Sequence, residues 1–170
     1  MGRFLVASML AIASLSADFS YGWQTLEHST LSTLNQNGSV TLNDVTINGP
    51  AKVNGHVKAD GCRFQSLEAN GRVDLENSSF SSNLKINGYL TADNCHFEKE
   101  IMLSTNKAVL KNSIAHDIRV KGNYYPLQPS LDLSGSTVMG LIVFENGGGE
   151  IITNSKTNLD NATIQGAVIN

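Results

Sequence analysis

Three carboxylates stand at equivalent positions of a repeating sequence, at Asp60, Glu76 and Asp93. They are 16 and 17 residues apart, and if one repeat forms one coil their side chains lie about 5 Å apart on one face. Carboxylates this close either turn into solvent or hold a cation, and Ca²⁺ favours such oxygen ligands. Since the Gly-rich nonapeptide calcium signature is absent, we expect a solvated acidic column and no obligatory cofactor, with calcium as the alternative.

The other reactive side chains do not assemble into a catalytic group. Lys58 and Lys111 are near the acidic column but form no cluster suited to proton transfer. Serines fall mainly at corners, where they serve turn geometry, and no nucleophile-elbow motif is present. The histidines fall in different columns or outside the repeat, which excludes a triad or a histidine metal site: His28, His56, His96 and His116. The sequence therefore predicts a protein that is not an enzyme.

The two cysteines, Cys62 and Cys95, occupy the same repeat position, with Ser78 between them in the intervening repeat. Two coils apart is roughly 9.5 Å, whereas a disulfide needs Cα atoms within about 7 Å. Two sulfur atoms at that separation cannot share one metal ion either. We therefore predict two free thiols packed as small apolar groups beneath a corner.

Two segments interrupt the repeat and are interpreted as loops. The first, Asn123 to Ser130, carries Tyr124 and Tyr125, and the second, Glu145 to Thr157, contains three consecutive glycines. Loops on a rigid scaffold often carry binding residues, and the two tyrosines offer flat surfaces for a sugar ring or a protein. The same loops would equally serve to cover a side of the scaffold.

The element that positions all these residues is a recurring turn. Successive glycines of the turn are spaced 17, 16, 17 and 34 residues apart, and Thr105-Asn106 stands midway in the last interval. A turn repeated at a fixed interval is typical of stacked coils. The turn is formed by these pairs: Asn37-Gly38, Asn54-Gly55, Asn70-Gly71, Asn87-Gly88 and Lys121-Gly122.

A second corner and three short strands complete each coil. The corner begins with a residue that enters the left-handed region easily, namely Asp44, Gly61, Asn77, Asn94, Asn112, Gly135 or Asn161. Before this corner, apolar residues alternate with polar ones, as at Val73 and Leu75. The last strand of each coil has a similar alternating pair, such as Leu84 and Ile86 or Leu141 and Val143. Between them, one apolar residue follows the corner, at Ile47, Phe64, Phe80, Phe97, Val138 or Ile164. This period of two predicts strands.

We therefore predict an all-β, single-domain parallel β-helix with seven coils of roughly 17 residues. Its length is on the order of 33 Å at one strand spacing per coil. A left-handed hexapeptide helix would need tandem units of six residues, which are absent, so we expect a right-handed helix.

The predicted domain boundaries begin with a secretory signal over residues 1–22. Arg3 precedes an apolar run that is too short to span a bilayer, and cleavage is expected after Ala17 or Gly22. Residues 23–37 are predicted to cap the helix, with Trp23 and nearby leucines over the open core, and residues 38–170 form the β-helix. The expected location is periplasmic or extracellular, without stable membrane insertion, and the net charge of −3 argues against nucleic acid as a partner.

The far end of the predicted helix has no comparable cover. Its last strand contains Ala167, Val168 and Ile169, and a final coil exposes backbone groups that proteins normally hide or pair. These three residues are the predicted self-association surface.

The coil pattern over residues 38–170 resembles the bactofilin-like polymer-forming proteins. The resemblance rests on the corners and on runs such as Gly71-Arg-Val-Asp-Leu-Glu-Asn-Ser-Ser-Phe and Leu133-Ser-Gly-Ser-Thr-Val-Met-Gly-Leu-Ile-Val. It implies right-handed β-helices that join end to end into filaments without nucleotide, as a cytoplasmic scaffold. The predicted signal and the two insertions depart from that pattern.

Two functions follow as hypotheses. The first is a non-catalytic exported structural or interaction module, which self-assembles through its terminal coil or contacts another protein or a glycan of the envelope. The second is a polysaccharide-binding or polysaccharide-cleaving protein that uses the acidic column and the tyrosine loop.

Overall fold

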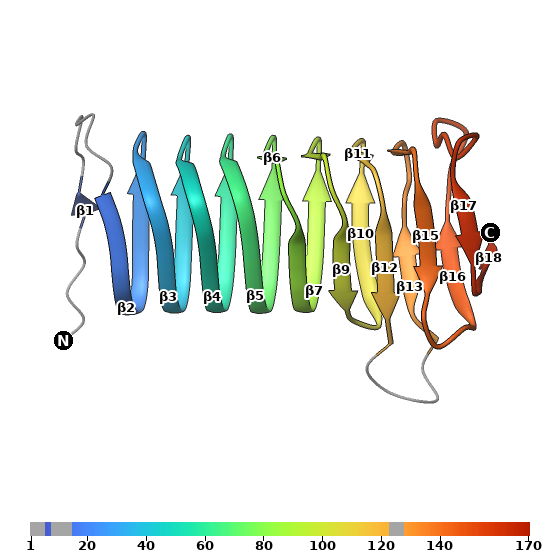
Figure 1. The fold of residues 1–170 in the computed structure, drawn as a ribbon, viewed down its shortest axis with the longest axis horizontal. Coiled ribbons are helices and arrows are strands. Elements are labelled where there is room, and N and C mark those ends of the chain that lie inside the picture. Colours follow the sequence, from blue (N-terminus) through green and yellow to red (C-terminus); the bar gives the residue numbers. More distant parts are fainter. Residues whose placement is uncertain (1–5, 8–14, 123–127) are drawn as a thin grey trace.

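The chain folds into a single all-β rod of parallel strands with about eight turns spaced near 17 residues, as Figure 1 shows. This computed structural model describes residues 6–7, 15–122 and 128–170, and for residues 6–7 and 15–20 it gives the backbone alone. The predicted parallel β-helix is confirmed. Tyr124 and Tyr125 lie outside the described residues, as does much of the predicted signal segment.

The described residues form eighteen strands and no helix, and hence none that could cross a bilayer as a helix. The strands are β1 (Val6–Ala7), β2 (Leu15–Glu27), β3 (Thr30–Asn43), β4 (Thr46–Asp60), β5 (Arg63–Glu76), β6 (Ser79–Phe80), β7 (Leu84–Asp93), β8 (His96–Phe97), β9 (Ile101–Ser104), β10 (Lys107–Lys111), β11 (Ile114–Ala115), β12 (Ile118–Lys121), β13 (Ser130–Asp132), β14 (Thr137–Val138), β15 (Leu141–Phe144), β16 (Gly149–Ile152), β17 (Thr163–Gln165) and β18 (Ala167–Ile169).

Each coil contributes one strand segment to each of three faces, and equivalent residues stack in register. On the first face the core column is Gln24, Val40, Val57, Val73, Leu90, Ala108, Leu131, Ile151 and Ile169. On the second face it is Leu31, Ile47, Phe64, Phe80, Phe97, Ala115 and Val138. On the third face it is Leu34, Ala51, Leu67, Leu84, Ile101, Ile118, Ile142 and Ile164.

The change between 16- and 17-residue repeats arises in one corner, between the second and third faces. Phe64 and Leu67 are three positions apart, whereas Phe80 and Leu84 are four apart, yet both pairs occupy the same two columns. The extra residue is absorbed by the corner, so the strands on either side keep their register. Without this absorption a one-residue shift would turn every core side chain outward.

The corner between the first and second faces has the backbone conformation that its residue types predict. Asp44, Asn77, Asn94 and Asn112 have φ values of 53°, 50°, 53° and 48°, and Gly61 has φ 64°. Asn and Asp tolerate this left-handed region better than other residues with a Cβ. The predicted bend is therefore confirmed in the central coils.

The equivalent positions predicted for Phe64, Phe80 and Phe97 are confirmed, and their rings form a ladder in the interior. Phe64, Phe80 and Phe97 are 3%, 1% and 1% exposed. The ring centroids of Phe64 and Phe80 are 4.8 Å apart, and those of Phe80 and Phe97 are 5.1 Å apart, both in stacked geometry. The ring spacing is close to one strand separation, so the ladder follows directly from the coil register.

The predicted cap over residues 23–37 is wrong, because these residues belong to strands β2 and β3 of a further coil. Leu31 and Leu34 do cover the core, but as members of its columns, at 1% and 0% exposure. Trp23 points outward and is 84% exposed. The coil escaped the sequence alignment because its corners are Gly22, which pairs with Gly38, and His28 with φ 46°, in place of Asn-Gly and Asn.

The second predicted insertion, Glu145 to Thr157, is also wrong, because it contains strand β16. Within that strand Ile151 is 0% exposed and pairs with Leu131. Strand β16 supplies the first-face segment of the last coil, and it is the additional coil at the N-terminal end that makes about eight turns instead of seven. The alignment of the last coil shifts accordingly: Asn158 takes the position below Thr137, so Asn161 is not the corner residue.

Two further assignments in the last coils change. Ile164 lies on the third face below Ile142. In strand β15 the inward residues are Ile142 and Phe144, at 0% and 3% exposure, instead of Leu141 and Val143. Across the corner before this strand, the column residues Val138 and Ile142 are four positions apart. In this corner the Asp117 carboxylate accepts a hydrogen bond from the Leu141 backbone N–H at 2.6 Å.

Candidate functional site

The core columns end on exposed apolar side chains at the C-terminal end of the rod. Val138, Ile142 and Ile151 are 1%, 0% and 0% exposed. One coil further on, Ile164 is only partly buried and Ile169 is 52% exposed. The core therefore opens at this end, where Figure 1 places β17 and β18.

Strand β18 also presents a backbone edge. Ala167, Val168 and Ile169 pair with Gly149, Glu150 and Ile151 of β16. The register pairings place no other described strand against the opposite side of β18. Val168, on the outward column, is 64% exposed. The structure thus brings the predicted self-association residues together as an apolar strand edge.

At the opposite end, the first described pairing already occupies part of the edge. Strand β1 runs parallel to β2, with Val6 opposite Thr25 and Ala7 opposite Leu26. The two ends of the rod therefore differ in how much of their backbone edge is available for pairing.

The predicted acidic column has the register expected from the sequence. Asp60 pairs with Glu76, and Glu76 with Asp93. Neighbouring asparagines engage two of these carboxylates: Asn77 Nδ2 donates to Asp60 Oδ1, and Asn112 Nδ2 donates to Asp93 Oδ1, each at 2.8 Å. Over the described residues, no group of three or more His, Cys, Asp or Glu side chains is placed to hold a metal ion.

A charged cluster that the sequence did not reveal lies on the first face. His56 Nε2 is 2.8 Å and Arg72 Nε is 2.7 Å from Asp74 Oδ2. Partial burial of Asp74 disfavours its charged form, but the hydrogen bonds from Arg72 and His56 outweigh that effect and lower its pKa. The sequence contained an indication of this cluster, because Arg72 and Asp74 are two residues apart on one strand face and His56 occupies the position equivalent to Arg72 in the adjacent coil.

Both cysteines are free and buried, as predicted, and they share a corner column with serines. The backbone N–H of Cys62 donates to Ser78 Oγ at 3.1 Å, and that of Cys95 to Ser113 Oγ at 3.0 Å. Each serine hydroxyl then donates back to a carbonyl of its own coil, at Glu76 or Lys111. The column is thus a structural device that links coils through small polar side chains.

We expect both thiols to resist alkylation in the folded protein. Burial is the main cause that raises the pKa of Cys62, and it raises that of Cys95 to about 11. Because only the thiolate is nucleophilic, about a thousandth of Cys95 would be reactive at pH 8 even if a reagent reached it. Mass spectrometry after iodoacetamide treatment should show unmodified native protein while denatured protein gains two adducts. Equal rates in the two samples would contradict this burial.

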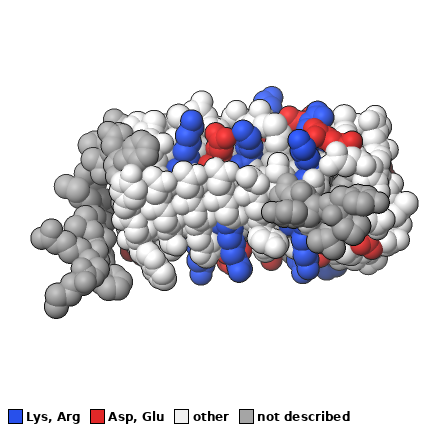
Figure 2. Space-filling view, turned by 90° about the horizontal axis from the view of Figure 1, so that it is seen from below, with Lys and Arg blue, Asp and Glu red and all other residues white. Residues whose placement is uncertain are grey.

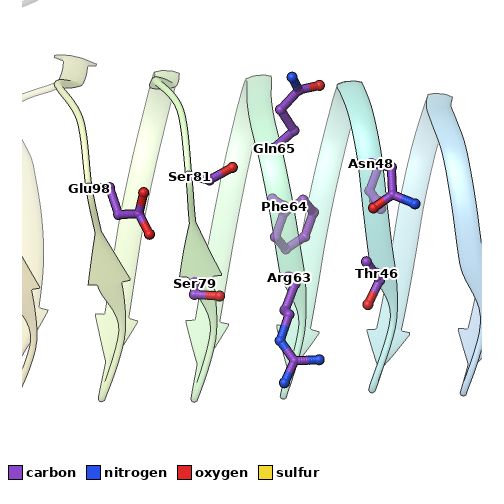
Figure 3. Close-up of a pocket in the computed structure, with 9 residues that line it drawn as sticks. Thr46, Asn48, Arg63, Phe64, Gln65, Ser79, Ser81 and Glu98 are labelled. Carbon is purple, nitrogen blue, oxygen red and sulfur yellow. The ribbon is translucent and has the colours of Figure 1, made fainter.

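A groove of about 410 Å³ lies on the second face and its corner with the third, as Figure 3 shows. Ile47 and Phe64, whose side chains are buried in the core at 1% and 3% exposure, also border it, and polar residues on four consecutive coils line it. They are Thr46 and Asn48, Arg63 and Gln65, Ser79 and Ser81, and Glu98. These positions flank the column residues Ile47, Phe64, Phe80 and Phe97, so strand alternation could have located them.

The edge formed by the Asn-Gly corners has a different character. Figure 2 looks onto this edge and shows a band of uncharged residues with charged residues of both signs along its borders. Along it, Asn54 Nδ2 donates to Asn37 Oδ1 at 3.0 Å, and Asn70 Nδ2 donates to Asn54 Oδ1 at 2.8 Å. These two hydrogen bonds link three consecutive coils, so the asparagines contribute to the stacking of the corners.

Comparisons of the chain with protein-family models, with curated proteins and with solved structures find no match. The fold and the surfaces define a class of architecture: a single-domain parallel β-solenoid with an open apolar C-terminal end and a polar groove on its second face.

Proposed function

We propose that this protein is a non-catalytic structural or interaction module that self-associates through its C-terminal coil. The observation that supports the proposal is the abrupt change in burial along the first-face column, from 0% at Ile151 to 52% at Ile169. Uncovered apolar area of this kind favours a contact that removes it from water.

Strand addition supplies the mechanism. An unpaired strand edge is a template for another strand. A second coil placed against this edge would also cover the exposed apolar side chains of the terminal coil. The partner we propose is a second copy of this chain, in a two-fold arrangement of one terminal coil against the other. The apolar residues exposed at this end, Val168 and Ile169, favour a contact between two like ends, in which both exposed edges are covered.

The proposed setting is the periplasm or the cell surface, and it rests on the predicted signal at residues 1–22. The resemblance to bactofilin-like proteins agrees with end-to-end contacts between β-helices. Because those proteins are cytoplasmic, we propose that the architecture and the end contact are shared and that the compartment differs.

Replacing Ile169 with lysine should abolish self-association. A charged side chain at the open core end would have to be desolvated in the contact, at a cost of several kcal/mol when unpaired. Sedimentation equilibrium should show dimers of the wild type and monomers of Ile169→Lys, with unchanged circular dichroism.

The matched control is Met139→Lys, which alters a side chain that is 45% exposed on the side of the rod. It should dimerise like the wild type. A wild type that stays monomeric at the highest soluble concentration would overturn the proposal, and so would equal association of all three proteins.

A further inference from the structure

The groove on the second face gathers polar side chains of several kinds. On the other faces, some polar side chains pair with one another: Lys85 with Glu68 at 2.9 Å, Arg72 with Asp74, and Asn70 with Asn54. Across the described residues, the seven polar side chains that line the groove make no hydrogen bond or ion pair with another residue. Their hydrogen-bonding groups are therefore open to solvent or to a ligand.

The main chain beneath the groove is already paired. The backbone N–H groups of Ser79, Ser81 and Glu98 donate to carbonyls of the preceding coil at 2.9, 3.1 and 3.0 Å. A peptide cannot add to this face as a strand, because strand addition needs free main-chain groups. A ligand here must be recognised through side chains alone.

The chemistry of these side chains fits a polyhydroxylated ligand. The hydroxyls of Ser79 and Ser81 and the amides of Asn48 and Gln65 both donate and accept hydrogen bonds, as sugar hydroxyls do. Arg63 adds a fork of donors that suits a carboxylate or a pair of hydroxyls, and the side-chain oxygens of Glu98 add acceptors. The lining spans three coil steps, which is about 14 Å, so the groove accommodates an extended chain instead of a single ring.

We propose that the groove binds an oligosaccharide segment that lies across the coils, with Arg63, Gln65 and Glu98 as its main contacts. The site is separate from the open C-terminal end, and it does not depend on self-association. It also differs from the acidic column, whose Asp60 and Asp93 carboxylates are held by asparagines.

Titration of ¹⁵N-labelled protein with soluble hexasaccharides tests the proposal. The probes are a neutral β-linked glucose hexamer and a galacturonate hexamer, which separate hydroxyl recognition from carboxylate recognition. Binding of either should shift the amide resonances around Asn48, Gln65 and Ser81. Arg63→Ala should weaken the binding roughly tenfold, as expected for the loss of a charge-assisted hydrogen bond.

Arg72→Ala is the matched control, since it removes the same side chain from another face, and it should bind as the wild type does. A second variant, Gln65→Ala, carries no change in charge and should also weaken binding. The proposal would be overturned if neither hexamer shifted the groove resonances, or if the shifts gathered around the exposed Trp23 and Tyr89 of the first face. Equal weakening by Arg63→Ala and Arg72→Ala would also overturn it.

Discussion

Replacing Phe80 with alanine should lower the free energy of unfolding by about 3–5 kcal/mol, the range for large-to-small changes of a buried aromatic residue. Phe80 is 1% exposed and stacks on both Phe64 and Phe97. The coils above and below are fixed by their own register, so the surroundings cannot collapse fully into the cavity. Chemical denaturation followed by circular dichroism measures the change.

The control for this variant is Tyr89→Ala. Tyr89 is 65% exposed, and exposed substitutions of this kind are usually within about 0.5 kcal/mol of the wild type. If Phe80→Ala were no more destabilising than Tyr89→Ala, the rings would not form the continuous interior stack on which the coil alignment depends.

Replacing Gly71 with alanine should destabilise the rod even though it adds a single methyl group. Gly71 has φ 138°, a conformation that costs about 1–3 kcal/mol for a residue with a side chain. A Cβ there would also overlap the carbonyl oxygen of Gly55 in the adjacent coil. Because that oxygen belongs to the paired backbone, it cannot move aside without disturbing the next turn.

Gly147→Ala is the control for a positive φ without a close neighbour. Gly147 has φ 68°, in the left-handed region that a side chain tolerates best, and a Cβ there meets no atom within 4 Å. Denaturation midpoints should therefore fall much further for Gly71→Ala, which combines a less tolerated φ with the close approach of Gly55. Similar losses in the two variants would show that neither feature of Gly71 contributes much.

The central coils could be aligned from the sequence because their corners are formed by the same residue types. From Gly38 to Gly88 every turn is Asn-Gly, and the bend residues are Asp, Gly or Asn, so the columns between them follow. At both ends the corner chemistry changes while the geometry does not. Gly22 pairs with Gly38 without a preceding asparagine, and Ile151 enters the core after a glycine run that reads as a loop.

The Thr105-Asn106 corner shows how a coil keeps the turn without glycine. Thr105 is 2% exposed, and its Oγ1 donates to the Lys107 carbonyl at 2.9 Å while accepting from the Lys107 N–H at 3.1 Å. A side chain thus supplies the hydrogen bonds of the turn. A corner that replaces glycine in this way has no fixed residue type by which it could be aligned. Its position is indicated only by the regular spacing of the neighbouring turns.

The surfaces were only partly predictable. The acidic column and the separation of Cys62 from Cys95 follow from register alone. The groove was missed because its residues, Arg63 and Gln65 among them, differ from coil to coil and form no repeated motif. Strand alternation marks these residues as outward-facing, but their grouping into a groove becomes visible only when unlike residues on neighbouring coils are placed side by side.

Because each coil pairs with the coils beside it, the length of the rod is set by the number of nearly equal steps. Gain or loss of one central repeat would move the apolar end and the opposite end apart or together by about 4.8 Å, without altering the shape of either. The separation of the two ends is thus encoded independently of the residues that form them.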